Sequence, residues 1–507
     1  MNKTQRLVAV IVSAVFSFLV VLTPKTFAQT PASPDADKNT RSRQYLELIN
    51  SVFGIVLQNY VDEVDPEVLY KGAMKGLMDS LEDPYTTYME GSLQRSINDT
   101  TAGKFGGVGL SITKPNVSTP ENPAYVEVAN PIEGTPGWRA GIQPGDLLIE
   151  IDGQATPDIS MDDVLGLLRG KIGTTVNVKV RRGKTMEFSV VLERALIEVP
   201  TVKYGMIESG INRTGYLRII EFTPQTPERV QEALSSFKAA SFTSLIIDLR
   251  NNPGGLISSV EAVADKFIDD GPVVSTKGRY PEDVSVYYAS PAKTTMPKNI
   301  PIVVLINAGS ASASEILSGA LKDNHKAYLI GENTYGKGSV QQPLPLPYND
   351  GIKLTIARYY SPSDINIDKV GIPPDKEVLF PTLTEEEQKA YVSMMNDNVI
   401  AEYTESHPNM TEEDISLFAE GLAKEYPLSG PLLRRMIRLS VNRTRGDMLY
   451  DLDYDVQLQA ALETVCSANF SALLKETKTL RQLEEEKALQ NEKNEKDIVA
   501  AKDGSAR

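Results

Sequence analysis

The chain has 507 residues, of which 41% are hydrophobic and 23% charged, and these proportions exclude a collagen, a coiled rod, a multispan membrane protein and wholesale disorder. The net charge of −15 argues against nucleic acid as a partner, because phosphate binding needs a basic face. A single cysteine, Cys466, excludes an internal disulfide, and two histidines, His325 and His407, leave little for a zinc site. We therefore expect no metal or other cofactor, and any covalent catalysis would depend mainly on Ser, Thr, Lys, Asp or Glu.

Residues 1–28 have the pattern of an export signal. Lys3 and Arg6 precede the charge-free stretch Leu7–Leu22, and small residues around Ala28 suit a signal peptidase. The stretch is shorter than a membrane span of roughly 20 residues, which favours a cleaved signal over a retained anchor. We expect export to the periplasm or cell envelope of a bacterium. Loss of the three basic residues of this segment takes the net charge from −15 to −18.

The next part of the chain is predicted to be a linker followed by a small helical domain. Residues 29–44 are rich in Pro, Thr, Ser and Asp, which is typical of a tether. Leu46, Ile49 and Val52 begin a series of apolar residues at helical spacing, and the predicted N-terminal helical domain covers residues 45–100.

Residues 101–193 resemble a PDZ domain of the circularly permuted kind found in bacterial proteases. A Gly-rich turn runs into a strand, and the sequence RAGIQPGD at 139–146 precedes a further strand. The resemblance implies that the backbone N–H groups of the turn bind the terminal carboxylate of a peptide, which adds to the next strand. The turn residues are Gly107, Val108, Gly109 and Leu110. An ordinary turn is the alternative.

The three remaining segments differ in their predicted secondary structure. Residues 194–380 contain short apolar strands separated by helices, which predicts an α/β core with parallel strands. Residues 381–472 have a helical pattern. The charged tail, 473–507, holds equal numbers of acidic and basic residues, so the acidic excess belongs to the folded part.

Two blocks in the α/β segment carry groups that could act on a substrate. The sequence GSASASEI at 309–316 ends a strand and starts a helix, where a seryl oxygen meets the positive end of the helix dipole. The sequence GKGSVQ at 336–341 places a lysine between glycines, and burial lets a lysine lose its proton near neutral pH. Such small residues at strand ends are more often turns or helix caps, and both interpretations stay open on these residues alone.

Three segments together resemble the carboxyl-terminal processing peptidases, also called tail-specific proteases. They are DLRNNPGG at 248–255, SASASEI at 310–316 and GENTYGKGSVQQ at 331–342, in the order of the family. The resemblance extends from about residue 45 to 376 and includes the PDZ domain. It implies a multidomain α/β fold, with a crotonase-like or ClpP-like protease core, an inserted PDZ domain and helical N- and C-terminal regions.

The resemblance also assigns roles to individual residues. It implies that Ser312 is the nucleophile, that Lys337 is the general base and that Gln341 orients the lysine. The oxyanion hole would consist of the N–H of Ala313 and that of a glycine in the PGG turn, Gly254. Neutral lysine can take the serine proton and later protonate the leaving amine, so the chemistry agrees with these assignments.

We therefore expect an exported serine endopeptidase that cleaves protein or peptide substrates near accessible C-termini after the PDZ domain captures them. A catalytically silent PDZ scaffold is the alternative from another class. A Ser-His-Asp site using His325 is a further alternative, although this histidine is expected at a helix end facing water. The family resemblance implies that the terminal helical regions support a homo-oligomer.

Overall fold

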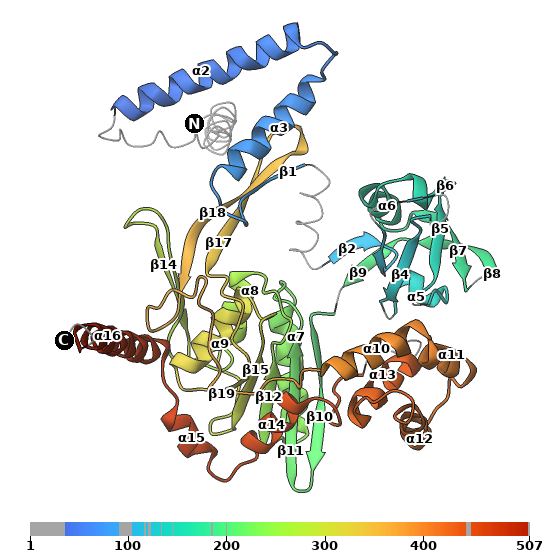
Figure 1. Ribbon diagram of the computed structural model, residues 1–507, viewed down its shortest axis with the longest axis vertical. Coiled ribbons are helices and arrows are strands. Elements are labelled where there is room, and N and C mark those ends of the chain that lie inside the picture. The colour runs from blue at the N-terminus through green and yellow to red at the C-terminus, as the bar shows by residue number, and fades with distance from the viewer. Residues whose placement is uncertain are drawn as a thin grey trace, which may run out of the picture. The chain divides into compact units, whose positions relative to one another are not determined.

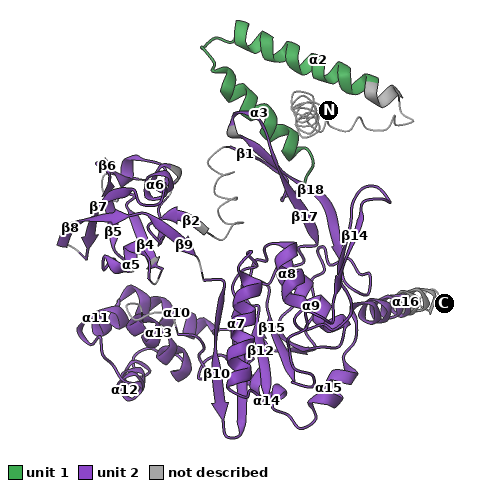
Figure 2. Ribbon diagram, turned by 180° about the vertical axis from the view of Figure 1, so that it is seen from behind, with its two compact units in different colours: residues 1–82 green, residues 83–507 purple. Residues whose placement is uncertain are grey.

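The computed structural model describes residues 36–507 apart from 91–103, 116–117, 120–122, 133, 144, 184–185, 199, 443–447 and 505–507. The chain divides into two compact units, residues 1–82 and 83–507 (Figure 2). The predicted signal, residues 1–28, lies outside the described residues. Among the helices that are described, none is both long enough and apolar enough to cross a membrane.

The first unit contains two helices, α2 (Ala36–Asn59) and α3 (Pro66–Asp79). Helix α3 starts at a proline, and the carboxylate of Asp65 caps it by accepting the N–H of Glu67 at 2.8 Å. Helix α2 begins inside the segment predicted to be a linker, so that prediction is wrong from residue 36. The polar composition suggested a coil, but neither proline nor glycine interrupts residues 35–53, and the helix can extend through them.

The predicted PDZ segment folds as a separate β-rich part (Figure 1). One sheet has the order β3-β4-β5-β7-β8, with β6 paired to β5, and β3 is therefore an edge strand. Valines on alternate positions of β4 and β7 fill its core. A two-stranded ribbon joins β2 to β9. The elements are β2 (Lys104–Gly107), β3 (Leu110–Thr113), β4 (Val126–Pro131), α5 (Pro136–Arg139), β5 (Leu147–Ile151), β6 (Gln154–Ala155), η1 (Thr156–Asp158), α6 (Met161–Leu168), β7 (Thr175–Arg182), β8 (Met186–Glu193) and β9 (Ala195–Glu198).

The main sheet of the core has the order β10-β11-β12-β15-β16-β19, and all its pairs except β10-β11 are parallel, as predicted. Helices α7, α8 and α9 pack on one face (Figure 1) with Leu245 and Ile247, and helix α14 packs on the other with Ile246. The alternation of side chains along β12 thus serves two cores. The elements are β10 (Val202–Ser209), β11 (Asn212–Ile219), α7 (Thr226–Ala239), β12 (Ser244–Asp248), α8 (Ile257–Ala264), β15 (Ile302–Ile306), α9 (Ala313–Asp323), β16 (Tyr328–Gly331), β19 (Lys376–Glu377) and α14 (Val456–Val465).

A second sheet of the core has the order β1-β18-β13-β14, with β17 also paired to β18. Strand β1 (Thr87–Met89) comes from the segment predicted to be the N-terminal helical domain, 45–100, so that boundary is wrong. Thr87 pairs with Lys353 of β18. A strand of three residues is too short to show an alternating pattern. The other elements are β13 (Gly271–Lys277), β14 (Val284–Ala289), β17 (Ser339–Pro345), η2 (Pro347–Asn349) and β18 (Gly351–Tyr360).

The predicted helical region 381–472 consists of two different parts. Helices α10 (Glu385–Asn396), α11 (Val399–Ser406), α12 (Glu412–Leu422) and α13 (Gly430–Asn442) bury a core of their own around Leu433 and Ile437. Helix α14 instead packs on the main sheet of the α/β core, which corrects the predicted boundary. Helices α15 (Phe470–Glu476) and α16 (Leu480–Gly504) follow, so most of the predicted charged tail is helical.

Candidate active site

Ser312 lies at the junction between the loop after β15 and helix α9. Its φ of +53° is a backbone conformation that a serine seldom adopts and that is common at functional sites. Two neighbours donate their hydroxyls to main-chain carbonyls, Ser310 to Leu249 at 2.8 Å and Ser314 to Asn252 at 3.0 Å. The Ser312 hydroxyl donates to no carbonyl in the described part of the chain. It is therefore the serine of this run that is left for chemistry.

Gly254 lies against the start of helix α9. Its φ is +105°, and a Cβ there would lie 2.8 Å from Cβ of Ser312 and 2.9 Å from the nitrogen of Ala313, so only glycine fits. Ala313 is the first helical residue, and its N–H has no partner within the helix. The Gly254 N–H donates to Oδ1 of Asn252 at 2.9 Å. The two predicted oxyanion donors thus flank Ser312, and an oxyanion would share the Gly254 N–H with Asn252.

Glu315, in the first turn of helix α9, is completely buried and joins the two candidate catalytic segments. Its Oε2 accepts the backbone N–H groups of Ser312 and Lys337, both at 2.8 Å. Its Oε1 accepts the hydroxyl of Thr334 at 2.6 Å and the N–H of Gly336 at 2.7 Å. Burial raises the pKa of Glu315, and these four hydrogen bonds act in the opposite direction. One carboxylate therefore fixes the loop of the lysine to the helix of the serine.

The environment of Lys337 makes its amine easier to deprotonate. Burial of the side chain lowers its pKa from the ordinary value of 10.5, and the positive charge of Lys353 lowers it further, while the charge of Glu315 acts in the opposite direction. Its Nζ lies 5.0 Å from the centre of the Tyr85 ring. A lysine with a lowered pKa can serve as a general base.

The side chains of the predicted catalytic pair are not bonded to each other. Among the described residues, no hydrogen bond joins Ser312 to Lys337. The amide of Gln341 donates to the hydroxyls of Ser339 at 2.8 Å and Thr355 at 3.4 Å, and not to the lysine. The structure therefore bridges the backbones of Ser312 and Lys337 through Glu315, leaves their side chains apart, and gives Gln341 other partners.

Two tyrosines at this site were not foreseen from the sequence. Tyr359, on β18, is buried, which raises its pKa to about 12, and a hydrogen bond with Ser312 acts in the opposite direction. Its backbone N–H donates to the carbonyl of Gly338 at 2.7 Å. Tyr85 precedes β1 and covers the Lys337 amine. Because the tyrosines come from segments far from the serine and lysine motifs, no local pattern indicated them.

Neither histidine contacts Ser312. His325 follows the far end of helix α9, and its Nδ1 bonds the hydroxyl of Thr477 at 2.8 Å. His407 is exposed and stacks on Tyr403 with ring centres 4.2 Å apart. The histidine-based alternative has no support in this geometry. No cluster of His, Cys, Asp and Glu side chains suited to a metal ion occurs within the described ranges.

A buried ion network supports the strand that leads to the Gly254 turn. Arg250 is nine-tenths buried and donates to both oxygens of Asp248, at 3.0 and 2.6 Å, and to both oxygens of Asp455, at 2.8 and 2.7 Å. It also donates to Gln457 at 3.1 Å. Burial alone would raise the pKa of Asp248, but the charge and hydrogen bonds of Arg250 hold it below its ordinary value. This network ties the end of β12 to the start of helix α14.

The predicted peptide-binding turn, Gly107–Leu110, connects β2 to the edge strand β3. Gly109 has a φ of +75°, and a Cβ there would lie 2.3 Å from the side chain of Thr135. The carbonyl of Val108 accepts the N–H of Gly137 at 2.8 Å. Hydrogen bonds accepted by its carbonyl groups thus fix the turn. It leads into β3, which is at the edge of the described sheet, and a peptide strand could add to this edge.

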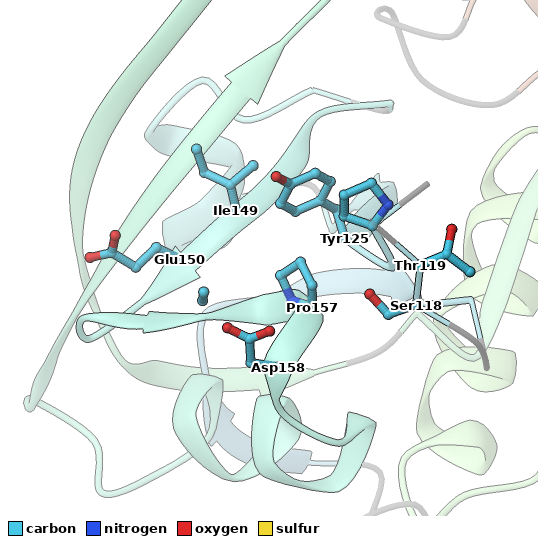
Figure 3. A pocket seen from close by; sticks show the side chains of 9 residues that line it. Ser118, Thr119, Tyr125, Ile149, Glu150, Pro157 and Asp158 are labelled. Atoms are coloured by element: carbon cyan, nitrogen blue, oxygen red, sulfur yellow. The ribbon is translucent and has the colours of Figure 1, made fainter. Parts of the chain in front are cut away.

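A different part of the PDZ segment forms a hollow of about 590 Å³. Figure 3 shows Tyr125, Ile149 and Pro157 around it, with the carboxylates of Glu150 and Asp158. These residues belong to β5 or to the ends of neighbouring elements. The hollow is therefore separate from the edge strand β3 and from its Gly-rich turn.

Three family models match the chain. The model of peptidase family S41 matches residues 213–378, the model of the PDZ domain residues 127–182, and the model of the activating protease CtpB N-terminal domain residues 10–92. Together with the observed sheets, they confirm the predicted fold class, an α/β protease core with an inserted PDZ domain and helical terminal regions.

Curated relatives show the same similarity. The chain is 37% identical to a carboxy-terminal-processing protease of Bartonella bacilliformis over 66% of this chain and 76% of that protein. It is 30% identical to the carboxy-terminal processing protease CtpA of Bacillus subtilis over 74% of this chain and 76% of that protein. Among solved structures, a photosystem II D1 C-terminal processing protease is 28% identical, with a TM-score of 0.41, over 66% of this chain and 92% of that one.

Proposed function

The chain belongs to peptidase family S41, with the carboxy-terminal processing proteases, and on this basis we propose that it is an exported serine endopeptidase with Ser312 as nucleophile and Lys337 as general base. The arrangement around Glu315 is the observation that carries the mechanism. One carboxylate oxygen accepts the N–H groups of both residues, which keeps the serine and the lysine of two distant motifs at one place.

The proposed reaction begins when Lys337 leaves the Tyr85 ring and its neutral amine takes the proton of the Ser312 hydroxyl. The serine oxygen attacks the carbonyl carbon, and the N–H groups of Ala313 and Gly254 stabilise the oxyanion. The lysine ammonium then protonates the leaving amine, which releases the C-terminal product. Water, activated by the same lysine, hydrolyses the acyl-enzyme and regenerates the serine.

Capture by the PDZ domain is the proposed source of preference for C-terminal segments. The edge strand β3 and the Gly107–Leu110 turn support this role, since a peptide can add to the strand and place its carboxylate at the turn. Export rests on the signal pattern of residues 1–28, and the periplasm or the cell envelope is the proposed location.

The test is incubation of the purified chain, without residues 1–28, with casein and with peptides of defined C-terminus, followed by mass spectrometry of the products. We expect cleavage that Ser312→Ala and Lys337→Ala abolish and that His325→Ala leaves intact. Cleavage by Lys337→Ala would contradict the proposed base. Peptide binding without Ser312-dependent cleavage would favour a PDZ scaffold instead.

A further inference from the structure

Tyr85 makes a contact with the candidate base that none of the sequence motifs includes. Its ring lies over Lys337, with 5.0 Å between Nζ and the ring centre. The turn that carries Tyr85 is fixed to the core. Asp83 accepts the N–H of Tyr85 at 3.0 Å and the hydroxyl of Thr86 at 2.6 Å, and Thr86 in turn accepts the N–H of Thr355 on β18 at 3.1 Å.

Tyr85 also lies near a second residue of the lysine loop, because Tyr335, two residues before Lys337, contributes to the raised pKa of the Tyr85 hydroxyl. Burial, followed by Tyr335 and by the charges of Asp368 and Glu315, raises the pKa of Tyr85 to about 12, so its hydroxyl keeps its proton at neutral pH. Glu315 holds the same loop from the other direction through Thr334, Gly336 and Lys337.

We propose that Tyr85 is a positioning residue whose ring covers the lysine amine, excludes water from it and holds it ready to move to Ser312. This proposal rests on the proposed role of Lys337 as the base. The turn of Asp83 and Thr86 fixes the ring.

The ring has two opposite effects on the pKa of Lys337, and the neighbouring charges add to each of them. A cation–π contact favours the ammonium by about 0.5 to 2 kcal/mol, as does the charge of Glu315. Exclusion of water and the charge of Lys353 favour the neutral amine. The pKa of Lys337 is lowered although the charge of Glu315 opposes this, and burial is the largest of the causes. Removal of the ring therefore returns water to the amine and favours the ammonium.

The test is the pH dependence of kcat/KM, from pH 5 to 10, for Tyr85→Ala and Tyr85→Phe, both without residues 1–28, on one fluorogenic peptide. Tyr85→Ala is expected to move the acid limb up by about one pH unit and to lower kcat/KM at pH 7 about tenfold, because each unit of pKa changes the neutral fraction tenfold. Tyr85→Phe keeps the ring and is expected to keep the wild-type limb. Tyr280→Ala, which removes an exposed ring 5.8 Å from the guanidinium of Arg279, is the matched control.

An unchanged or lowered acid limb in Tyr85→Ala would overturn the inference. If that variant does not fold, Tyr85→Phe still tests it, because a limb shifted by loss of the hydroxyl alone contradicts a role for the ring. The proposed function fails in a different way, through activity that survives Lys337→Ala. An inactive Lys337→Ala beside an unshifted Tyr85→Ala would contradict only the role of Tyr85.

Discussion

The backbone N–H groups of Ser312 and Lys337 converge on one carboxylate oxygen, each at 2.8 Å. The oxygen belongs to Glu315, which no solvent reaches. Since both residues donate main-chain N–H groups to it, the carboxylate fixes the separation of the two segments without using either side chain of the pair.

Glu315→Gln is expected to destabilise the protein by about 2 to 5 kcal/mol and to reduce cleavage strongly, because the amide NH₂ would face two N–H donors in a buried place. Chemical denaturation and kcat/KM measure the two effects. Glu387→Gln is the matched control, since Glu387 accepts the N–H of Thr384 at 2.8 Å in the same helical position on the surface. Equal losses in the two variants would contradict the importance of the buried carboxylate.

Lys353→Gln is expected to shift the acid limb of kcat/KM to higher pH by about 0.3 to 0.5 units. The charge of Lys353 lowers the pKa of Lys337, so its removal raises that pKa, and the ammonium persists to higher pH. The shift should shrink at high salt, where the charges are screened. Lys238→Gln, at the exposed end of helix α7, should leave the profile unchanged. A limb that moves to lower pH would refute the assignment of the base.

Gly254→Ala is expected to lower kcat/KM about 100-fold or more, because the new Cβ would collide with Ser312 and displace the turn that carries an oxyanion donor. Gly271→Ala is a close control. Its φ of +103° nearly equals the +105° of Gly254, but the nearest atom to its Cβ is 3.6 Å away. Steady-state kinetics of both variants separates backbone strain from damage to the site. The prediction fails if both lose activity equally.

Arg250→Met is expected to cost about 3 to 5 kcal/mol of stability, because it leaves Asp248 charged and buried without its partner. In the native protein the lowered pKa of Asp248 adds stability at pH values above 3.8, the ordinary pKa of an aspartate. This stability is lost as the pH falls from 3.8 through the lower native pKa. Denaturation midpoints at pH 7 and at a pH well below 3.8 check both statements. Arg229→Ala, which breaks an exposed pair with Glu232, should cost about 0.5 kcal/mol or less.

Gly109→Ala is expected to weaken the binding of peptides with a free C-terminus to the PDZ domain about tenfold or more, because the new Cβ would overlap Thr135 beside the predicted carboxylate turn. Gly141→Ala controls for the conformation, since it has the same φ of +75° and open space around its Cβ. Isothermal titration with matched free and amidated peptides measures the effect. Equal affinities of the two variants would argue against this turn.

The sequence predicted those parts of the fold whose signal is local. Strands β12 and β15 are continuous apolar runs, which is why their burial on both faces and their parallel pairing could be foreseen. Ser312 and Lys337 could be named because their motifs surround them closely. Helix α2 was partly missed because a polar helix has no apolar stripe at its start.

Contacts between distant segments could not be predicted in this way. Asp455 bonds Arg250 across 205 positions of the chain, and Tyr85 meets Lys337 through a strand of three residues. Both pairs are too far apart in the sequence for a local motif to include them. In the tertiary structure Gln341 donates hydrogen bonds to Ser339 and Thr355. These partners depend on the register of β17 and β18, which the sequence does not give.

Strand β1 has a consequence for the modularity of this family. It follows the N-terminal helices directly in the chain, yet it pairs with β18 of the catalytic core, and the turn before it supplies Tyr85. In a chimera of two relatives, a crossover at residue 82 would take strand β1, Tyr85 and the catalytic core from the same parent. A crossover after Met89 would take β1 and Tyr85 from one parent and the core from the other. Natural recombination and protein engineering should therefore tolerate the first junction far better than the second.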